Sequence, residues 1–460
     1  MYENEYSVFD PAALTLLGTV PDFGEADVAR AVEAAERAAV QWSRDLEVRR
    51  VLMRQAAEQV RAHQADIAST LTLEQGKPVR DAMAEVGVCA DLLDYYSTLP
   101  FEDTVHLPER SGRTPRVQYR PVGVVGAITP WNFPLSLLMV KTAPALLAGC
   151  TVVARPSATT PMSTIQLFEA LGRVLPGDVV QVCTGQDRTV SVALANHPGV
   201  RKLSFTGSTG VGISLAQRAL GTVKRVTLEL GGNDPAIVLE DVNIEAVARQ
   251  LMGSAFKNSG QVCMAAKRIY VPESIASSFV DAAAAVIDEF TLGHGLEPDT
   301  SHGPLHNQSQ LQVVSGLVDE ARAAGGRVVT GGRAAEVGLP GYFYEPTLVA
   351  DCRAGMALVD QEQFGNALPI VAYRDLDDAV AQANDSEFGL GASVWGTDLE
   401  RADDVAGRLE AGTVWVNQHT VVELDAPFGG WKQSGLGRER GRAGLDPYLE
   451  PRTINVAEAL

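Results

Sequence analysis

The stretch VGVVGAITPWNFPLSLLMVKTAPALLAGCTVVA, residues 122–154, decides the fold class that we expect for this 460-residue chain. Its two ends, 122–129 and 151–154, are short apolar runs bounded by Gly and Pro, and they predict strands. The segment 135–147 between them has a helical pattern. Such alternation predicts a parallel sheet covered by helices on both faces. Further strand-like runs, separated by helical segments, follow at 179–183, 202–205 and 225–228.

The alternation starts again after Gly232, which indicates a second unit of the same class. A chain of 460 residues suits two or three domains of about 100–200 residues each. We therefore expect two successive α/β domains that meet near residue 231. The second series of strand-like and helical runs lies at 236–239, 244–256, 268–271, 274–290, 327–330, 347–350 and 369–373.

Helical and extended stretches flank this alternating region. Residues 27–68 are rich in Ala, Glu and Arg at helical spacing and predict two helices. The helical pattern of 71–96 continues after a break at 76–78. Residues 113–123 and the C-terminal residues have an extended pattern.

The composition is that of a soluble globular protein, with 46% hydrophobic and 21% charged residues. Lys and Arg number 38 against 57 Asp and Glu, and the net charge of −19 disfavours nucleic acid and anionic membranes as partners. The start, MYENEYSVFD, lacks the basic region and apolar run of a signal peptide, and no later stretch is long and apolar enough to span a bilayer. We therefore expect a cytoplasmic protein.

Cys263 is the cysteine that the sequence singles out. It lies in FKNSGQVCMAAKR, residues 256–268, after the turn signal Asn258-Ser259-Gly260, and a thiol beside a tight turn can be approached by a ligand. The alternative is a buried cysteine that acts as a small hydrophobe. The chain has five cysteines, which are scattered and lack CxxC spacing, so neither a disulfide framework nor a cysteine metal site is indicated.

Four other motifs surround this stretch. PWNFP (130–134) and LELGGNDP (228–235) precede it, and QEQFG (361–365) and PFGGWKQSG (427–435) follow it. In this combination and order they resemble the aldehyde dehydrogenase superfamily over nearly the whole chain. The resemblance implies oxidation of an aldehyde to a carboxylic acid, with NAD as the expected cofactor because it prevails in the family and with NADP as the alternative. It implies the hydrolytic branch rather than the CoA-acylating one, because Glu229 is present.

The resemblance also assigns roles to parts of the chain. The resemblance implies an extended arm that pairs with another subunit, so a homodimer or homotetramer is expected. The residues of this arm alone are equally compatible with a self-contained hairpin. The expected parts are a Rossmann-like nucleotide-binding domain (1–108 and 122–231), a catalytic domain (232–427), a return segment near the active site (428–444), and a small β oligomerisation arm (109–121 and 445–460).

Five catalytic residues follow from the resemblance. Cys263 would attack the aldehyde as a thiolate and form a thiohemiacetal, whose oxyanion the Asn132 amide and the Cys263 backbone N–H would hold. Glu229 would activate the water that hydrolyses the thioester, and Lys141 and Glu439 would carry protons away. Taken alone, Asn132 could cap a turn, Glu229 could be a satisfied strand-end carboxylate, and Lys141 with Glu439 could be a structural ion pair.

The loop FTGSTGVG, residues 205–212, follows a predicted strand and precedes a helix. Its backbone N–H groups could approach a pyrophosphate at the helix N-terminus, although an ordinary strand-to-helix turn is equally compatible. The cofactor contacts that the resemblance implies are Thr129, Pro130, Trp131, Arg155, Ser157, Ala158, Gly207, Ser208, Leu230, Glu362 and Phe364.

Several positions depart from the family pattern. Arg155 and Ala158 stand where Lys and Glu are usual, and Gly210 stands where Glu is common, so NADP stays open because Arg155 could pair with a 2′-phosphate. Asn366 replaces a Pro, which predicts a less rigid loop. Asn233 replaces a frequent Lys, and no catalytic consequence follows from the sequence.

Three residues are expected to contact the substrate. Leu137, Val140 and Met264 predict a roomy apolar tunnel for an aromatic, terpenoid or long aliphatic aldehyde. Members of the family that act on succinic semialdehyde carry an Arg at the position of Val140. The alternative is an amino-aldehyde, which Glu423 and Asp425 at the expected tunnel mouth leave open, or a semialdehyde.

Two rival functions need other features. A cysteine hydrolase or acyltransferase without redox chemistry needs a base such as His, and none of the seven histidines lies in a recognisable Cys/His signature. A non-catalytic protein on the same fold would not need Cys263, Asn132 and Glu229 together. The Gly and Pro residues between His294, His302 and His306 break helical geometry, so no metal site is expected.

Overall fold

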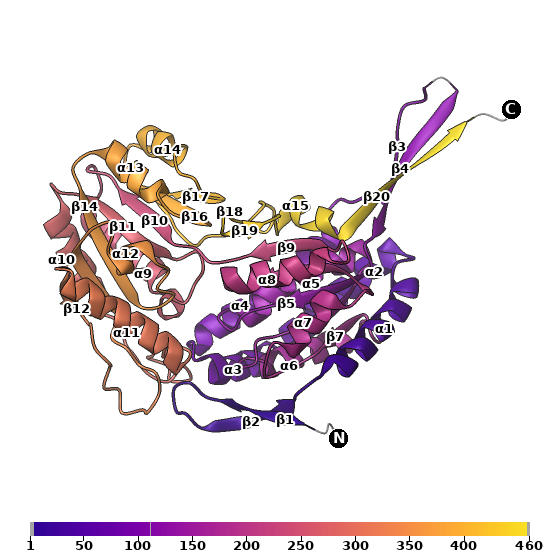
Figure 1. Ribbon diagram of the computed structural model, residues 1–460, viewed down its shortest axis with the longest axis horizontal. Coiled ribbons are helices and arrows are strands. Elements are labelled where there is room, and N and C mark those ends of the chain that lie inside the picture. The colour runs from indigo at the N-terminus through magenta and orange to yellow at the C-terminus, as the bar shows by residue number, and fades with distance from the viewer. Residues whose placement is uncertain (1–3, 111, 458–460) are drawn as a thin grey trace.

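The computed structural model describes residues 4–110 and 112–457, and the chain forms two lobes that lie side by side (Figure 1). The first lobe holds a six-stranded sheet of order β19-β9-β8-β5-β6-β7, and the second lobe a seven-stranded sheet of order β12-β13-β14-β11-β10-β16-β17. Two successive α/β units built on parallel sheets, which the alternating pattern predicts, are thereby confirmed.

Five strands of the first sheet run parallel, and β19 joins its edge antiparallel to β9. The strand β5 is buried along its whole length, as its continuous apolar pattern requires. The elements of this sheet and its connections are β5 (Val124–Ile128), α5 (Pro134–Ala148), β6 (Thr151–Arg155), α6 (Met162–Gly172), β7 (Val180–Val182), α7 (Thr189–Asn196), β8 (Val200–Thr206), α8 (Thr209–Leu220), β9 (Arg225–Glu229) and β19 (Gly435–Leu436).

The N-terminal region holds one helix more than predicted. Residues 27–68 contain α1 (Glu25–Trp42), α2 (Leu46–Ala62) and the start of α3 (Gln64–Gln75), not two helices. The break between α2 and α3 falls at His63, where neither Gly nor Pro marks it in the sequence. The next helix, α4 (Val79–Thr98), follows the expected break at Gly76, which has a left-handed φ of 101°. A hairpin of β1 (Glu5–Phe9) and β2 (Leu16–Pro21) precedes α1 and was not predicted.

The second sheet is parallel except at one edge, where β12 pairs antiparallel with β13. The strand β10 lies near its centre, between β11 and β16. The elements of this lobe are β10 (Asp234–Val238), α9 (Ile244–Ala255), the 3₁₀ turn η1 (Lys257–Gly260), β11 (Ala266–Pro272), α10 (Ala276–Ile287), α11 (Gln308–Ala323), β12 (Arg327–Thr330), β13 (Thr347–Cys352), α12 (Ala357–Asp360), β14 (Ala367–Tyr373), α13 (Leu376–Asn384), β15 (Phe388–Gly389), β16 (Gly391–Trp395), α14 (Leu399–Ala406) and β17 (Thr413–Val416).

The chain returns from the second lobe to the first through β18 (Trp431–Lys432), β19 and α15 (Gly441–Leu445), and then the turn η2 (Asp446–Tyr448) leads into β20 (Leu449–Ala457) (Figure 1). β20 pairs antiparallel with β4 (Arg113–Pro121), and β4 pairs on its other side with β3 (Thr104–His106). The strand at 113–121 is therefore not part of a self-contained hairpin. This arm projects from the first lobe (Figure 1), and the homodimer or homotetramer stays a prediction.

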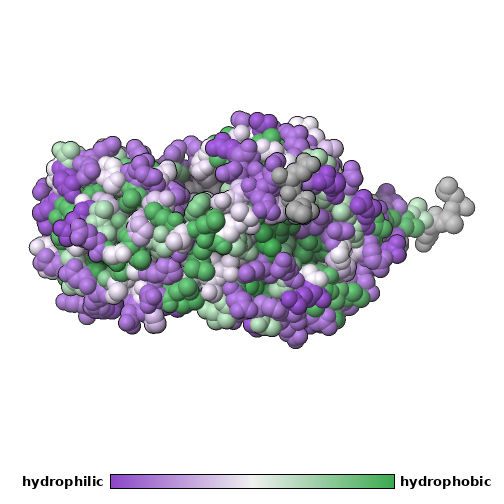
Figure 2. Space-filling model, turned by 90° about the horizontal axis from the view of Figure 1, so that it is seen from below, coloured by the Kyte–Doolittle hydropathy of each residue, from purple (hydrophilic) through white to green (hydrophobic). Residues whose placement is uncertain are grey.

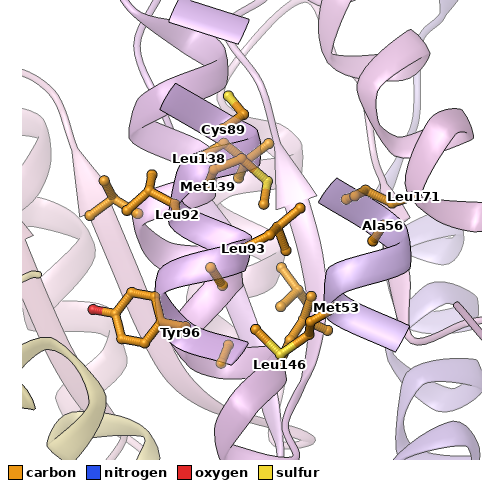
Figure 3. Packing of buried hydrophobic residues seen from close by; sticks show 14 of the residues in the cluster. Met53, Ala56, Cys89, Leu92, Leu93, Tyr96, Leu138, Met139, Leu146 and Leu171 are labelled. Carbon is orange, nitrogen blue, oxygen red and sulfur yellow. The ribbon is translucent and has the colours of Figure 1, made fainter. Parts of the chain in front are cut away.

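The core of the first lobe fixes the helix that matters most for the site. α5 is buried on nearly all sides, and in Figure 3 its Leu138, Met139 and Leu146 pack among Leu92 and Leu93 of α4 and other side chains with exposures of 0%. A helix that is buried all round leaves little freedom to the loop that precedes it. On the outside, hydrophilic residues cover much of the face seen in Figure 2. Among the described residues, no helix is long and apolar enough to cross a membrane.

Candidate active site

Two open cavities meet at Cys263. One, of about 750 Å³ of empty space, lies against Glu229, and we call it the Glu229 cavity. The other, of about 760 Å³, lies against Glu362, and we call it the Glu362 cavity. A group in either cavity can reach the same thiol. The residues that line both are Asn132, Leu137, Thr206, Leu230 and Cys263.

The thiol of Cys263 owes its position to a strained turn. Asn258, Ser259 and Gly260 in η1 have left-handed φ values of 51°, 55° and 73°. Gly260 is required there, because a Cβ would come within 2.2 Å of the Gly365 carbonyl oxygen. Cys263 is half-buried and lines both cavities, whereas the other four cysteines are buried, so the interpretation as a buried hydrophobe does not describe it.

Burial raises the pKa of the Cys263 thiol to about 12, and the nearby charge of Lys267 acts in the opposite direction. The Lys267 ammonium donates hydrogen bonds to the backbone oxygens of Val262 (2.6 Å) and Cys263 (2.8 Å). Lys267 therefore holds the backbone carbonyl of Cys263 and that of the residue before it. Neither its position nor its partners could be read from the sequence.

Asn132 presents a side-chain amide beside the thiol. It lies just before α5, is 2% exposed, and lines both cavities. One of its two amide N–H bonds is directed to the Gln261 carbonyl oxygen at 2.9 Å. Because the amide has a second N–H, it can still donate to an oxygen bound at Cys263.

A buried ion pair that the sequence did not reveal holds the Asn132 loop. The Lys77 ammonium lies 2.6 Å from Glu85 Oε2 and donates to the Asn132 backbone oxygen at 2.7 Å. Glu85 Oε1 accepts the first free backbone N–H groups of α5, from Leu135 (3.0 Å) and Ser136 (3.2 Å). The pair therefore couples the start of α5 to the loop that carries the candidate oxyanion donor.

Replacing Glu85 with alanine should lower the free energy of unfolding by about 3–5 kcal/mol, because it leaves the Lys77 ammonium buried without its carboxylate. Chemical denaturation would measure the change. Glu289→Ala, which breaks the exposed ion pair with Arg249, is the matched control and should have little effect. Equal effects of the two variants would contradict the bracing role of Glu85.

Glu229 ends β9 with a carboxylate that has no partner. Both of its oxygens are buried and make no hydrogen bond with any described residue. Burial and the charge of Glu439 raise the pKa of Glu229 well above the usual range of a glutamate. Gly429 packs against it, since a Cβ there would lie 2.8 Å from Oε1. The missing hydrogen bonds favour a proton acceptor over a satisfied strand-end carboxylate, and the catalytic role of Glu229 stays a prediction.

Lys141 and Glu439 come together from distant parts of the chain. The Lys141 ammonium lies 2.6 Å from Glu439 Oε1 and donates to Thr206 Oγ1 at 2.7 Å, and all three groups are buried. Thr206 and Glu439 line the Glu229 cavity. The contact is the predicted pair, and both a proton path and a structural ion pair remain compatible with it.

The Glu362 cavity holds most of the residues that were predicted to contact the cofactor. Trp131 stacks on His306 with ring centroids 4.4 Å apart and meets Phe364 edge-on at 5.5 Å, which gives the cavity a flat aromatic wall. Glu362 accepts the Gly232 backbone N–H at 3.1 Å and lies 3.6 Å from Lys267. Seven of the predicted cofactor residues line it, namely Pro130, Trp131, Gly207, Ser208, Leu230, Glu362 and Phe364.

The other four predicted cofactor residues lie outside the lining of this cavity. Thr129 is buried, and Ser157 and Ala158 follow β6. The Arg155 guanidinium donates to the backbone oxygens of Gly185 (3.2 Å) and Asp187 (2.7 Å). A pairing of Arg155 with a 2′-phosphate, which the sequence left open, would therefore have to compete with these carbonyls. Gly210 is exposed, with open space around its α-carbon.

Two of the departures from the family pattern have structural partners. The Asn366 amide donates to the Tyr344 backbone oxygen at 2.6 Å, so this hydrogen bond holds the loop that was expected to be less rigid. The Asn233 amide donates to the Val359 backbone oxygen at 2.9 Å. Both are buried contacts between segments of the second lobe, and only the fold reveals them.

The Glu229 cavity is less apolar than its three predicted residues suggest. Leu137, Val140 and Met264 line it as expected, together with other apolar side chains. Lys257 and Arg440 also line it, and both were missed. Neither is in an ion pair with any residue that the structure describes.

The loop expected at the tunnel mouth contributes different residues from those predicted. Thr420 and Val422 line the Glu229 cavity, whereas Glu423 and Asp425 are exposed and are not part of its lining. The two carboxylates therefore do not form a cation site inside the cavity, and the amino-aldehyde stays a prediction without support from the lining.

Two of the histidines make contacts within the fold. His306 stacks on Trp131 and donates to or accepts from Thr159 Oγ1 at 2.6 Å, and His294 contacts Asp10 at 2.9 Å. No group of three or more His, Cys, Asp or Glu residues in 4–110 and 112–457 could hold a metal ion. Within the same ranges, no histidine lines either cavity. The carboxyl and thiol groups that do line them are those of Glu229, Glu439, Glu362 and Cys263.

Comparisons with known proteins show the family to which this chain belongs. A family model described as the aldehyde dehydrogenase family matches residues 2–454. The chain is 37% identical to the succinate-semialdehyde dehydrogenase [NADP(+)] of Escherichia coli, covering 96% of this chain and 92% of that relative. It is 37% identical to the glutarate-semialdehyde dehydrogenase of Pseudomonas putida, with 98% and 94% covered. A crystal structure of betaine aldehyde dehydrogenase from Staphylococcus aureus with NAD+ superposes with a TM-score of 0.96 at 32% identity, with 99% and 92% covered.

Proposed function

Because the chain belongs to the aldehyde dehydrogenase family, we propose that it oxidises a semialdehyde, an aldehyde whose far end carries a carboxylate, to the corresponding diacid. The chain is an aldehyde dehydrogenase that uses NAD or NADP. The observation that carries the proposal is the pair of cations, Lys257 and Arg440, on the wall of the Glu229 cavity. A carboxylate inside a partly apolar cavity needs such a partner.

This proposal replaces the apolar aldehyde that Val140, Leu137 and Met264 suggested. Two relatives that share more than nine-tenths of their length with this chain are named for semialdehydes, succinate semialdehyde and glutarate semialdehyde. The apolar side chains fit the methylene chain of such a substrate, and the cations fit its distal end. The two cations, Lys257 and Arg440, stand at other positions of the chain than these three apolar residues.

The first half of the reaction takes place at Cys263. The thiol loses its proton to solvent in the open cavity, and the thiolate forms a bond to the aldehyde carbon, which gives a thiohemiacetal. The second N–H of Asn132 and the backbone N–H of Cys263 donate to the new oxyanion. A nicotinamide held in the Glu362 cavity would supply the hydride acceptor, and loss of hydride from this carbon would leave a thioester on Cys263.

The second half is hydrolysis of that thioester. The Glu229 carboxylate takes a proton from a water molecule, whose oxygen attacks the thioester carbon while the bond to the Cys263 sulfur breaks. Glu439 lines the same cavity, its charge acts on Glu229, and its carboxylate can receive the proton, while the Lys141 ammonium pairs with Glu439 at 2.6 Å. The sum is aldehyde, water and oxidised cofactor going to acid, reduced cofactor and one proton.

The sequence alone left a hydrolase or acyltransferase without redox chemistry as a rival function. It would need a base for the thiol, and in the described part of the chain neither cavity offers a histidine. It would also have no use for the aromatic wall of the Glu362 cavity. Formation of reduced cofactor from an aldehyde separates the two functions directly.

We expect kcat/KM for glutarate semialdehyde to exceed that for pentanal, its neutral counterpart of equal chain length, by at least about tenfold, the equivalent of one charge-assisted hydrogen bond. Formation of reduced cofactor at 340 nm, with NAD and with NADP, measures both. Lys257 is exposed, so Lys257→Met should lower the ratio of the two kcat/KM values only about 3- to 5-fold. Lys257→Arg should keep the wild-type ratio. A wild-type enzyme that prefers pentanal would refute the semialdehyde proposal.

A further inference from the structure

Arg440 has a backbone conformation that normally belongs to glycine. Its φ of 63° and ψ of 166° lie in a region that is essentially restricted to Gly, because a Cβ crowds the backbone there. Such conformations persist only where surrounding structure enforces them, and they concentrate at functional sites. Arg440 thus carries a large side chain at a position where glycine would be free of strain.

Hydrogen bonds fix the backbone of Arg440 from both sides. Just before it, Glu439 and Phe428 exchange backbone hydrogen bonds of 2.8 Å in each direction. Just after it, Gly441 donates to the Leu424 backbone oxygen at 2.9 Å. The Arg440 carbonyl accepts from Gly444 at 2.7 Å, at the start of α15. The direction in which the side chain leaves the backbone is thus set by the fold.

The side chain enters the Glu229 cavity and finds no protein partner there. Arg440 is half-buried and lines the cavity, yet its guanidinium makes no hydrogen bond or ion pair with the residues in 4–110 and 112–457. Burial lowers the pKa of Arg440, and the charged or ionisable groups that act on it are Glu439 and Tyr96. The neighbouring Arg438 differs, because its guanidinium donates to the backbone oxygens of Gly430 (3.2 Å) and Gly437 (2.6 Å).

We propose that Arg440 is the main specificity determinant of this enzyme and that its guanidinium binds the distal carboxylate of the substrate through paired hydrogen bonds. The planar fork of arginine matches a carboxylate, and a half-buried guanidinium gains more from such a partner than an exposed ammonium does. Arg440 therefore outweighs the exposed Lys257. This inference rests on the proposed semialdehyde activity and identifies the residue that confers it.

The test compares three variants on glutarate semialdehyde and pentanal. In Arg440→Gly the ratio of kcat/KM for the semialdehyde to that for pentanal should fall about 10- to 100-fold, mostly through KM of the semialdehyde. Arg440→Lys should lose less, because it keeps the charge. Arg442→Ala is the matched control, since Arg442 is the next arginine in the chain but pairs with Asp446 at 2.8 Å and is not part of the cavity lining; its ratio should stay at the wild-type value.

Thermal melting separates binding from folding. Glycine adopts the backbone of residue 440 without strain, so Arg440→Gly should melt on the order of 2 °C higher than Arg440→Ala, which keeps the Cβ. A stable Arg440→Gly variant with the wild-type ratio would overturn the assignment while leaving the semialdehyde activity intact. Equal losses for both aldehydes would overturn it as well. If the wild-type enzyme itself prefers pentanal, the proposed function fails first.

Discussion

Cys263→Ser is expected to reduce the formation of reduced cofactor by at least about 10⁴-fold, the order seen when a covalent nucleophile is removed. A serine hydroxyl is a far weaker nucleophile at neutral pH and has no base beside it, since no histidine lines either cavity among the described residues. Steady-state absorbance of the reduced cofactor measures the loss.

Thiol labelling provides the control for that variant. Iodoacetamide should modify Cys263 in the native enzyme and spare Cys89, Cys150, Cys183 and Cys352, which are buried. The Ser variant should take up no label under the same conditions. Turnover that survives the substitution undiminished would exclude Cys263 as the nucleophile and with it the thioester route.

Glu229→Gln should lower steady-state turnover about 10²- to 10⁴-fold, the usual contribution of a general base, and leave a rapid first burst of reduced cofactor. The burst reports formation of the thioester, which does not need Glu229, and the slow phase reports its hydrolysis, which does. Stopped-flow absorbance with an excess of aldehyde resolves the two phases. Disappearance of the burst would show that Glu229 acts before hydride transfer.

The pH dependence of the slow phase follows from the environment of Glu229. Because burial and Glu439 raise its pKa, the carboxylate forms only at a higher pH than is usual for a glutamate. Hydrolysis by the wild-type enzyme should therefore increase as the pH rises through this raised pKa and should be lost below it. The Gln variant has no such titration, so its slow phase should lack that increase.

The sequence predicted the fold well wherever local pattern determines structure. The runs at 122–129 and 151–154 became β5 and β6 because each is apolar, short and bounded by Gly or Pro. The break at His63 was missed because neither Gly nor Pro marks it. The hairpin at 113–123 was left open because the strand that pairs along β4, β20, lies at the other end of the chain.

In the candidate site, too, the residues that lie in sequence motifs were predicted, and those that act through long-range contacts were not. Cys263, Asn132 and Glu229 lie in motifs, and the structure brings all three to the wall of one cavity. Lys77 and Glu85 had no such motif, because their role depends on a contact with the loop before α5. A long-range contact of this kind is a property of the fold.

The charge of the substrate cavity was the hardest feature to foresee. Lys257 was visible in FKNSGQVCMAAKR, but nothing in the sequence shows that the side chain reaches the cavity rather than solvent alone. Arg440 was more deeply hidden, because its direction depends on a backbone conformation that arginine rarely adopts. The prediction of an apolar tunnel therefore included neither Lys257 nor Arg440.

The intact mass of the Glu229→Gln enzyme, measured after it is mixed with glutarate semialdehyde and oxidised cofactor, tests covalent catalysis through Cys263. We expect the protein to gain the mass of one glutaryl group and peptide mapping to place this group on Cys263. The same mixture with Cys263→Ser, or without cofactor, should give no such adduct. Burst formation of reduced cofactor without an acyl group on Cys263 would contradict covalent catalysis through this thiol.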